Sequence, residues 1–182
     1  MAEVAQSAGQ GEQGLLAANR WALTGRGGSV TVTPARGGNH GPVGVRNTYH
    51  FAYADGTPFK PVGTTVYSWT HRPPEMEALT LATLRKAPFN KVRMLVFPQS
   101  YGVKTLPPRW PFQGTPPRGW DFTRVNPEFF RHLEARVGQL RDLGIEADLI
   151  LFHPYDDRAW GFEAMNAEAV DRYMRYLVAR LS

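Results

Sequence analysis

Hydrophobic and polar residues follow two different patterns, one in the first third of the chain and one in the rest. Residues 1–20, rich in Ala, Gln, Gly and Glu, show no hydrophobic period and are predicted to be a disordered or weakly helical tail. In residues 21–57, Ser29–Thr33 alternates as a strand does, and Tyr49–Tyr53 is a second candidate strand. An Asp-Gly turn signal begins at Asp55. This segment is predicted to be antiparallel β and is too short to form a β-sandwich alone.

Residues 58–182 alternate short apolar runs with amphipathic helical segments. The predicted strands are Pro61–Trp69, Lys91–Phe97 and Ile145–Phe152. The predicted helices are Glu75–Ala87, one that begins after the Asn126-Pro127 cap and ends at Gly144, and one that Asn166 caps. The last helix has an apolar stripe of Val170, Tyr173, Met174, Leu177, Val178 and Leu181. Because βα units repeat, the pattern predicts a parallel sheet with right-handed crossovers.

A Pro-rich segment with two tryptophans, Pro98–Val125, separates the second strand from the second helix and is predicted to be a long loop. After the third helix the sequence offers no further strand to cover its apolar stripe. Three βα units make about three-eighths of a (β/α)₈ barrel, which takes about 250 residues. The predicted fold class is therefore α/β, a partial TIM barrel of three βα units preceded by a short β-rich segment.

Composition narrows the class of protein. A chain of 182 residues with 42% hydrophobic and 20% charged residues is typical of one globular domain, with or without part of another. The absence of cysteine excludes disulfides, thiolate metal sites and a cysteine nucleophile. No apolar run reaches the length of a membrane span, so no membrane partner is predicted. The N-terminus lacks a basic region followed by an apolar one, so no signal peptide is evident and a cytoplasmic location is favoured.

The net charge of +5 does not predict a nucleic-acid partner. Residues 1–50 carry four bases and two acids, and residues 51–182 carry seventeen bases and fourteen acids, so the excess is spread along the chain. The densest basic stretch, Arg85–Arg124, is divided between a strand and the Pro-rich loop. A phosphate-binding face needs clustered bases, which this distribution does not provide.

Aromatic and hydrogen-bonding residues follow all three predicted strands. In βα folds the working face is formed at the carboxyl ends of the strands, so these residues are candidates for one site. Aromatic rings stack on the apolar faces of sugars, and the sugar hydroxyls need fixed hydrogen-bonding partners. The sequence therefore predicts a carbohydrate-binding site; the alternative is that the rings only cap the core. The candidate residues are Trp69, His71, Gln99, His153, Tyr155, Asp156 and Trp160.

Arg93 is a further candidate because it lies inside an apolar strand. An unpaired buried guanidinium is costly, so a carboxylate partner is expected. Arg93 either orients an active-site carboxylate or belongs to a structural ion pair. His153, directly after the third strand, is expected to bind a substrate hydroxyl, to position a neighbour, or simply to satisfy a local hydrogen bond.

No cofactor or metal is predicted. The five histidines have neither HxH nor HExxH spacing. The chain also lacks a nucleophile elbow, a phosphate-binding loop and the glycine fingerprint of dinucleotide-binding enzymes, which weakens the alternative of a small oxidoreductase. Asp156 and Asp157 are adjacent on a loop, and adjacent carboxylates seldom face each other across a scissile bond. Loop solvation or helix capping is the plainer interpretation of that pair.

Five segments together resemble the apiosidase-like (β/α)₈ glycoside hydrolases, and the resemblance covers about residues 29–182. Its last segment departs from the family, because Asp156–Trp160 is looser than a Tyr-Asp-Arg-Trp pattern. The resembling segments are Phe51–Phe59, Pro61–His71, Pro88–Pro98, Trp120–Phe130 and Leu143–Asp156.

The resemblance implies retaining hydrolysis of O-glycosidic bonds, in plant or microbial polysaccharide, by a general acid and a nucleophile. In the wider clan these carboxylates lie at the ends of strands four and seven, and Arg93 and His153 match residues that support them. It also implies that residues 21–57 are the remnant of a small β-sandwich domain and that 58–182 begin the barrel. We therefore expect a truncated chain with no catalytic residue of its own. The alternative is a non-catalytic, carbohydrate-binding half-barrel that forms homodimers or self-associates through open sheet edges.

Overall fold

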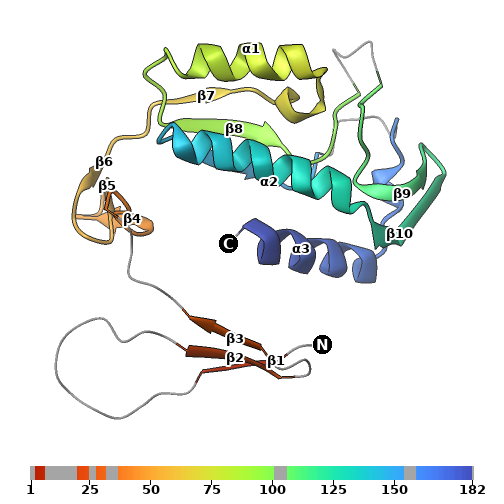
Figure 1. Cartoon of the computed structure of the whole chain (residues 1–182), viewed down its shortest axis with the longest axis horizontal. Helices are drawn as coiled ribbons and strands as arrows, with labels where there is room; N and C mark the ends of the chain where they lie inside the picture. Colours follow the sequence, from red (N-terminus) through yellow and green to blue (C-terminus); the bar gives the residue numbers. More distant parts are fainter. Residues whose placement is uncertain are drawn as a thin grey trace. The chain divides into compact units, whose positions relative to one another are not determined.

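The structure, a computed structural model, describes residues 3–6, 20–24, 28–31, 37–100, 106–153 and 159–181 (Figure 1). The chain divides into two compact units, Met1–Lys60 and Pro61–Ser182. Within the described residues no helix combines the length and the hydropathy needed to cross a membrane.

The first unit contains two small antiparallel sheets. One has the order β1-β2-β3 and the other β4-β5-β6. Their strands are β1 (Glu3–Gln6), β2 (Arg20–Thr24), β3 (Gly28–Thr31), β4 (Val43–Arg46), β5 (His50–Tyr53) and β6 (Pro58–Phe59). β1 falls within the predicted tail, whose residues 7–19 lie outside the described part of the chain. The predicted Asp-Gly turn is confirmed: Tyr53 N donates to Thr57 O at 2.9 Å, and Gly56 has a φ of +88°.

The second unit alternates strands and helices as predicted. Its elements are β7 (Gly63–Thr65), the 3₁₀ turn η1 (Trp69–His71), α1 (Pro74–Leu84), β8 (Lys91–Leu95), β9 (Phe112–Thr115), β10 (Gly119–Val125), α2 (Pro127–Asp142), β11 (Glu146–Ile150), the 3₁₀ turn η2 (Phe162–Ala164) and α3 (Ala167–Leu181). β7, β8 and β11 form a parallel sheet with β8 in the centre. Successive βα units are therefore neighbours in a mixed α/β fold, and closure into a barrel remains a prediction.

Local sequence signals set the ends of the helices. Asn126 caps α2 by accepting a hydrogen bond from the Glu128 N–H at 3.1 Å, and Pro127 occupies the first helical position. The helix ends before Gly144, whose φ of +72° suits a residue without a Cβ. Asn166 caps α3 through the Ala169 N–H at 2.9 Å. These features confirm the predicted starts of α2 and α3 and the predicted end of α2, whereas α1 ends at Leu84, before the predicted Ala87.

Alternate residues of β8 face opposite sides of the sheet. Val92 and Met94 are fully buried in the hydrophobic core with Leu133 and Leu140 of α2. Lys91 and Arg93 lie on the opposite, open side of the sheet. Figure 1 shows α1 and α2 running alongside β7 and β8. The strand period of two therefore separates an apolar face under the helices from a charged face.

Part of the predicted stripe of α3 faces solvent. Tyr173 and Leu177 are buried in the core, whereas Val178 is exposed. Adjacent residues on a helix are about 100° apart around its axis, so Val178 does not share the face of Leu177 that packs on the core. The buried face of α3 is therefore narrower than the predicted apolar stripe.

The segment predicted to be a long loop contains a β-hairpin, which is a correction to the sequence prediction. β9 and β10 pair in antiparallel fashion, with Gly114 opposite Trp120. Gly114 has a φ of +117°, and a Cβ there would collide with the Gly119 carbonyl oxygen. β9 is short and contains Gly114, and the alternation in β10 extends only over Trp120–Thr123 inside a Pro-rich segment, so the strand signal is weak. Contacts with the rest of the unit, described below, hold this hairpin.

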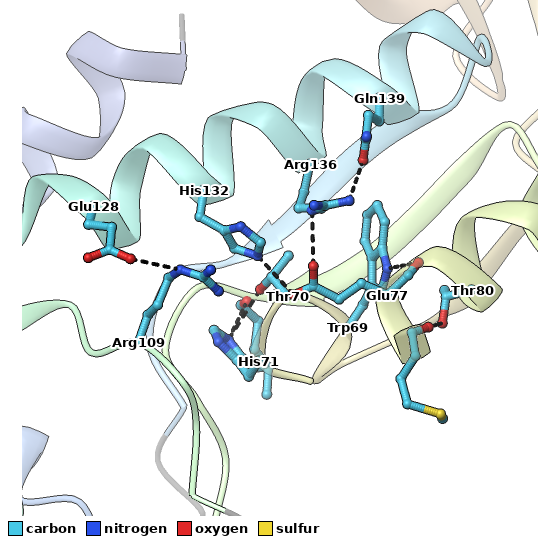
Figure 2. Close-up of polar contacts among 12 residues, drawn as sticks. Trp69, Thr70, His71, Glu77, Thr80, Arg109, Glu128, His132, Arg136 and Gln139 are labelled. Atoms are coloured by element: carbon cyan, nitrogen blue, oxygen red, sulfur yellow. Dashed lines mark hydrogen bonds and ion pairs between the residues drawn. The ribbon is translucent and has the colours of Figure 1, made fainter. Parts of the chain in front are cut away.

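A buried carboxylate joins α1 to α2 (Figure 2). Glu77, which is 1% exposed, accepts a hydrogen bond from His132 Nε2 at 2.8 Å through Oε1 and forms an ion pair with Arg136 Nε at 3.2 Å through Oε2. Both partners come from successive turns of one face of α2. The Glu77 main-chain oxygen also accepts a hydrogen bond from Trp69 Nε1 at 2.9 Å. One residue thus connects two helices and the turn that follows β7.

Replacing Glu77 with Ala is expected to lower the free energy of unfolding by about 3 kcal/mol, because it leaves the charge of Arg136 without its partner in a largely buried position. Glu75→Ala is the matched control, since Glu75 is exposed on the same helix and its loss should cost less than about 0.5 kcal/mol. Urea unfolding followed by circular dichroism measures both. Equal losses in the two variants would contradict a stabilising role for the buried network.

Candidate functional site

The carboxyl ends of the three parallel strands meet at one edge of the sheet. Main-chain hydrogen bonds between neighbouring strands continue to the carboxyl ends of the strands and just beyond them. Leu95 N donates to Tyr67 O at 3.0 Å, and Val96 N donates to Ile150 O at 3.0 Å. The segments that follow β7, β8 and β11 therefore start side by side. In α/β sheets this is the edge where ligands bind. The sequence placed the candidate residues on these three segments.

Trp69 and His71, both predicted to contact carbohydrate, lie in the core beneath this edge. Trp69 is 2% exposed and His71 is 5% exposed. His71 stacks on Phe129 of α2 with ring centroids 5.8 Å apart, and its Nε2 lies 3.3 Å from Leu95 O. Tyr67, two residues before Trp69, is 36% exposed. In this structure the buried pair supports the strand end, and the exposed ring next to them is Tyr67.

Burial holds His71 in its neutral form. Burial lowers the pKa of His71 from 6.5 to about 4, and the hydrogen bond to the Leu95 carbonyl opposes this shift only in part. Because a carbonyl oxygen can only accept, the neutral ring carries its proton on Nε2. Figure 2 shows His71 near the Glu77 network, where His132 contributes a further, smaller lowering of its pKa.

Arg93 has the carboxylate partner that the sequence predicts, but it is not buried. Its Nε donates to Asp148 Oδ2 of β11 at 3.0 Å, and 55% of its side chain is exposed. Lys91 Nζ lies 3.4 Å from the same oxygen. Burial disfavours the charged form of Asp148, yet the hydrogen bond from Arg93 and the charge of Lys91 outweigh it and lower its pKa. The expectation of burial was wrong because Arg93 points away from the helices.

A shallow depression lies over these three charged residues on the open face of the sheet. Its volume is about 220 Å³, and Gly63, Thr64 and Thr65 of β7 complete its lining. It therefore brings together charged groups from β8 and β11 and uncharged residues from β7, away from the segments that follow the strand ends.

Two of the remaining candidates come shortly after strand ends. Gln99 follows β8 and His153 follows β11, and both are half-buried. Tyr155 and Asp156 lie outside the described residues. Trp160 is half-buried, and its main-chain oxygen accepts a hydrogen bond from Trp120 Nε1 at 2.6 Å.

Trp110 and Trp120 join Trp160 in an aromatic cluster that sequence reasoning did not assign. The ring of Trp110 lies 5.5 Å from that of Trp120 and 5.0 Å from that of Trp160. Trp120 also stacks on Phe162, with centroids 5.7 Å apart. The sequence feature that pointed to this cluster was the presence of two tryptophans in the Pro-rich segment. It does not predict a cluster by itself, because the hairpin is needed to bring the two rings together.

Two contacts fix the position of this cluster. Asn126 Nδ2 donates to Trp110 O at 2.9 Å, which ties the base of the hairpin to the start of α2. At the other end Gly161 lies against Pro117, where a Cβ would collide with the Pro117 carbonyl oxygen. Half-buried indoles in fixed positions form an apolar surface suited to stacking on sugar rings. Among the described residues, no group of three His, Asp or Glu side chains could hold a metal ion.

Similarity to known proteins agrees with this geometry. A sequence model of the apiosidase-like catalytic domain matches residues 45–182. A candidate glycoside hydrolase from Bacteroides vulgatus ATCC 8482 has a similar crystal structure, with a TM-score of 0.80 and 47% identity over 89% of this chain and 35% of that one. A second solved structure, of a glycoside hydrolase, has a TM-score of 0.57 and 16% identity over 78% of this chain and 32% of that one, and it supports the fold alone. No curated protein matches the chain.

The fold and the family match define a glycoside hydrolase-like α/β protein. The chain belongs to the apiosidase-like family, which confirms the resemblance seen in the sequence. It spans about a third of the length of the solved structures that it matches.

The neutral, buried His71 predicts a stability that depends on pH. Its pKa of about 4 in the folded chain lies below the unfolded value of 6.5, so the unfolded chain takes up the proton first as the pH falls. The free energy of unfolding should therefore decrease between about pH 6.5 and pH 4, by roughly 3 kcal/mol in total. Urea unfolding at several pH values measures this decrease.

His71→Gln should remove most of this pH dependence, whereas His50→Gln, at an exposed position, should retain it. An unchanged pH profile in His71→Gln would show that other groups cause the loss of stability.

Proposed function

We propose that this chain supplies part of the substrate-binding face of a glycoside hydrolase that acts on O-glycosidic bonds of plant or microbial polysaccharide. The observation that carries the proposal is the meeting of three consecutive parallel strand ends at one sheet edge, with exposed or half-buried aromatic and hydrogen-bonding side chains on the segments that follow. In this proposal residues 58–182 are the first three βα units of a (β/α)₈ barrel, and residues 21–57 are the remnant of a β-sandwich domain.

The candidate residues take different roles in this face. Gln99 and His153 offer an amide and an imidazole to sugar hydroxyls. Trp160, held by Trp120, provides an apolar surface for a sugar ring. Trp69 and His71 act as supports of the first strand end, because they are buried. Tyr155 and Asp156 remain candidates for direct contact on the strength of the sequence.

The reaction itself requires a general acid and a nucleophile at strand ends beyond the three present here, as the family resemblance implies. Arg93 is paired with Asp148, so its proposed role in this chain is to form an ion pair on the open side of the sheet. The 182-residue chain, which spans 35% of its relative from Bacteroides vulgatus, is therefore expected to bind saccharide without hydrolysing it.

Binding without turnover is the outcome that tests this proposal. Titration of the chain with cellohexaose, xylohexaose and mannohexaose in a calorimeter should detect binding of at least one, and aryl glycosides should give no release of phenol. His153→Ala should weaken that binding about tenfold, the equivalent of one hydrogen bond to a ligand. His50→Ala, an exposed histidine of the first unit that is not among the candidate residues, is the control. Turnover that is lost in His153→Ala would refute the proposed inactivity.

A second candidate function is a self-associating, non-catalytic half-barrel module. The observation that favours it is that β7 and β11 each pair with a strand on one side only within the described residues. Unpaired strand edges are sites where a second copy of the chain can add its own strand. In parallel strands successive residues direct their hydrogen bonds to alternate sides, and Glu146 N bonds to Asn90 O beside β8. The N–H groups of Ala147 and Leu149 therefore point to the open edge.

If β11 mediates self-association, Ala147→Pro should convert a dimer into a monomer, because proline removes an outward N–H and leaves the pairing with β8 intact. Ala147→Val, which keeps that N–H, is the control. Size-exclusion chromatography with light scattering distinguishes the two states. A compact monomer in the unaltered chain would exclude the self-associating module.

A further inference from the structure

A groove separates the outer side of the β9–β10 hairpin from the first turns of α3. Its volume is about 260 Å³, and its walls come from β10 on one side and from η2 and α3 on the other. Figure 1 shows that β10 and α3 are neighbours. The residues used in the argument below are Trp120, Asp121, Phe122, Asn166, Glu168 and Arg172.

The groove combines an aromatic wall with groups that both donate and accept hydrogen bonds. Trp120 and Phe122 provide the aromatic carbon. Hydrogen bonds from the Thr123 side chain and main chain lower the pKa of Asp121, so its carboxylate is an acceptor at neutral pH. Arg172 Nη2 donates to Glu168 Oε1 at 2.7 Å, and its guanidinium has further donors. Asn166 caps α3 through Oδ1, and its NH₂ group is a second donor.

The walls of the groove are fixed in advance of any ligand. Trp120 is held by its hydrogen bond to Trp160 O and by its stacking on Phe162. The opposite wall is fixed by the Asn166 cap. A preformed groove avoids the entropic cost of ordering side chains when a ligand binds. Trp120 belongs to both the groove and the aromatic cluster, so this one residue links them.

We infer that this groove is a second carbohydrate subsite, which takes a neutral sugar unit remote from the bond to be cleaved. Sugar hydroxyls both donate and accept, as the mixture of Asp121, Asn166 and Arg172 requires, and the apolar side of the ring matches Trp120 and Phe122. Arg172 pairs with Glu168 and also interacts with the charge of Asp121, so the lining carries one net negative charge and offers no strong site for an ionic ligand. The inference rests on the proposed function, since it extends the same binding face outward.

The test compares two arginines of α3 that differ in their relation to the groove. Arg172 lines it and pairs with Glu168 at 2.7 Å, whereas Arg175 pairs with Asp171 at 2.8 Å and is not among the lining residues. Arg172→Gln and Arg175→Gln each break one exposed i,i+4 ion pair, so their effects on stability should match. The same three hexasaccharides serve as probes, and calorimetry gives Kd. The indole N–H signal of Trp120 in a ¹⁵N spectrum reports binding at the groove or at the adjoining aromatic cluster, and the two arginine variants distinguish these.

Arg172→Gln is expected to raise the Kd of the bound hexasaccharide about tenfold, with Arg175→Gln unchanged and the Trp120 signal shifted by ligand in the unaltered chain. Unchanged Kd in Arg172→Gln, together with weakened binding in His153→Ala, would overturn the subsite and leave the proposed function standing. Equal weakening in both arginine variants would also overturn it. Failure of all three hexasaccharides to bind the unaltered chain would refute both proposals.

Discussion

The burial of the Glu77 carboxylate constrains the second unit more than any other single contact. A carboxylate with almost no exposure requires compensating partners, and α2 provides both of them, His132 and Arg136. The main chain of the same residue receives the indole N–H of Trp69. The distance between α1 and α2 and the position of the turn after β7 are thereby set together. The parallel pairing of the three strands then fixes the end of β7 in relation to β8 and β11.

The candidate binding face depends on this arrangement and on a second set of contacts around the hairpin. Asn126 performs two tasks, since its Oδ1 caps α2 and its Nδ2 holds the main chain of Trp110. Trp120 connects the hairpin with the segment after β11. The candidate binding face is therefore formed by loops. Hydrogen bonds from the side chains of Asn126 and Trp120 to main-chain oxygens hold these loops in place. This gives positional accuracy to residues that are far apart in sequence.

The sequence predicted features that are encoded locally and missed those that need the folded chain. The caps at Asn126 and Asn166 and the three parallel strands could be predicted, because each has a signal within a few residues. The hairpin was missed because its strand signal is short, and because contacts with Trp160 and Gly161, some forty residues further along the chain, hold it in place. The burial of Trp69 and the exposure of Arg93 were missed because strand parity gives the side of a residue and not what covers it.

The close approach of Gly161 to Pro117 also bears on which positions can vary in related chains. The atom that a side chain at 161 would strike is a main-chain carbonyl oxygen, so no exchange of the residue at 117 could make room for it. Variation at Gly161 would push the hairpin outward and displace its indoles together, whereas Gln113 and Arg118 are exposed and can change without moving them. Changes in ligand preference among related chains are therefore expected to come from substitutions at the exposed residues of the hairpin, while Gly161 is retained.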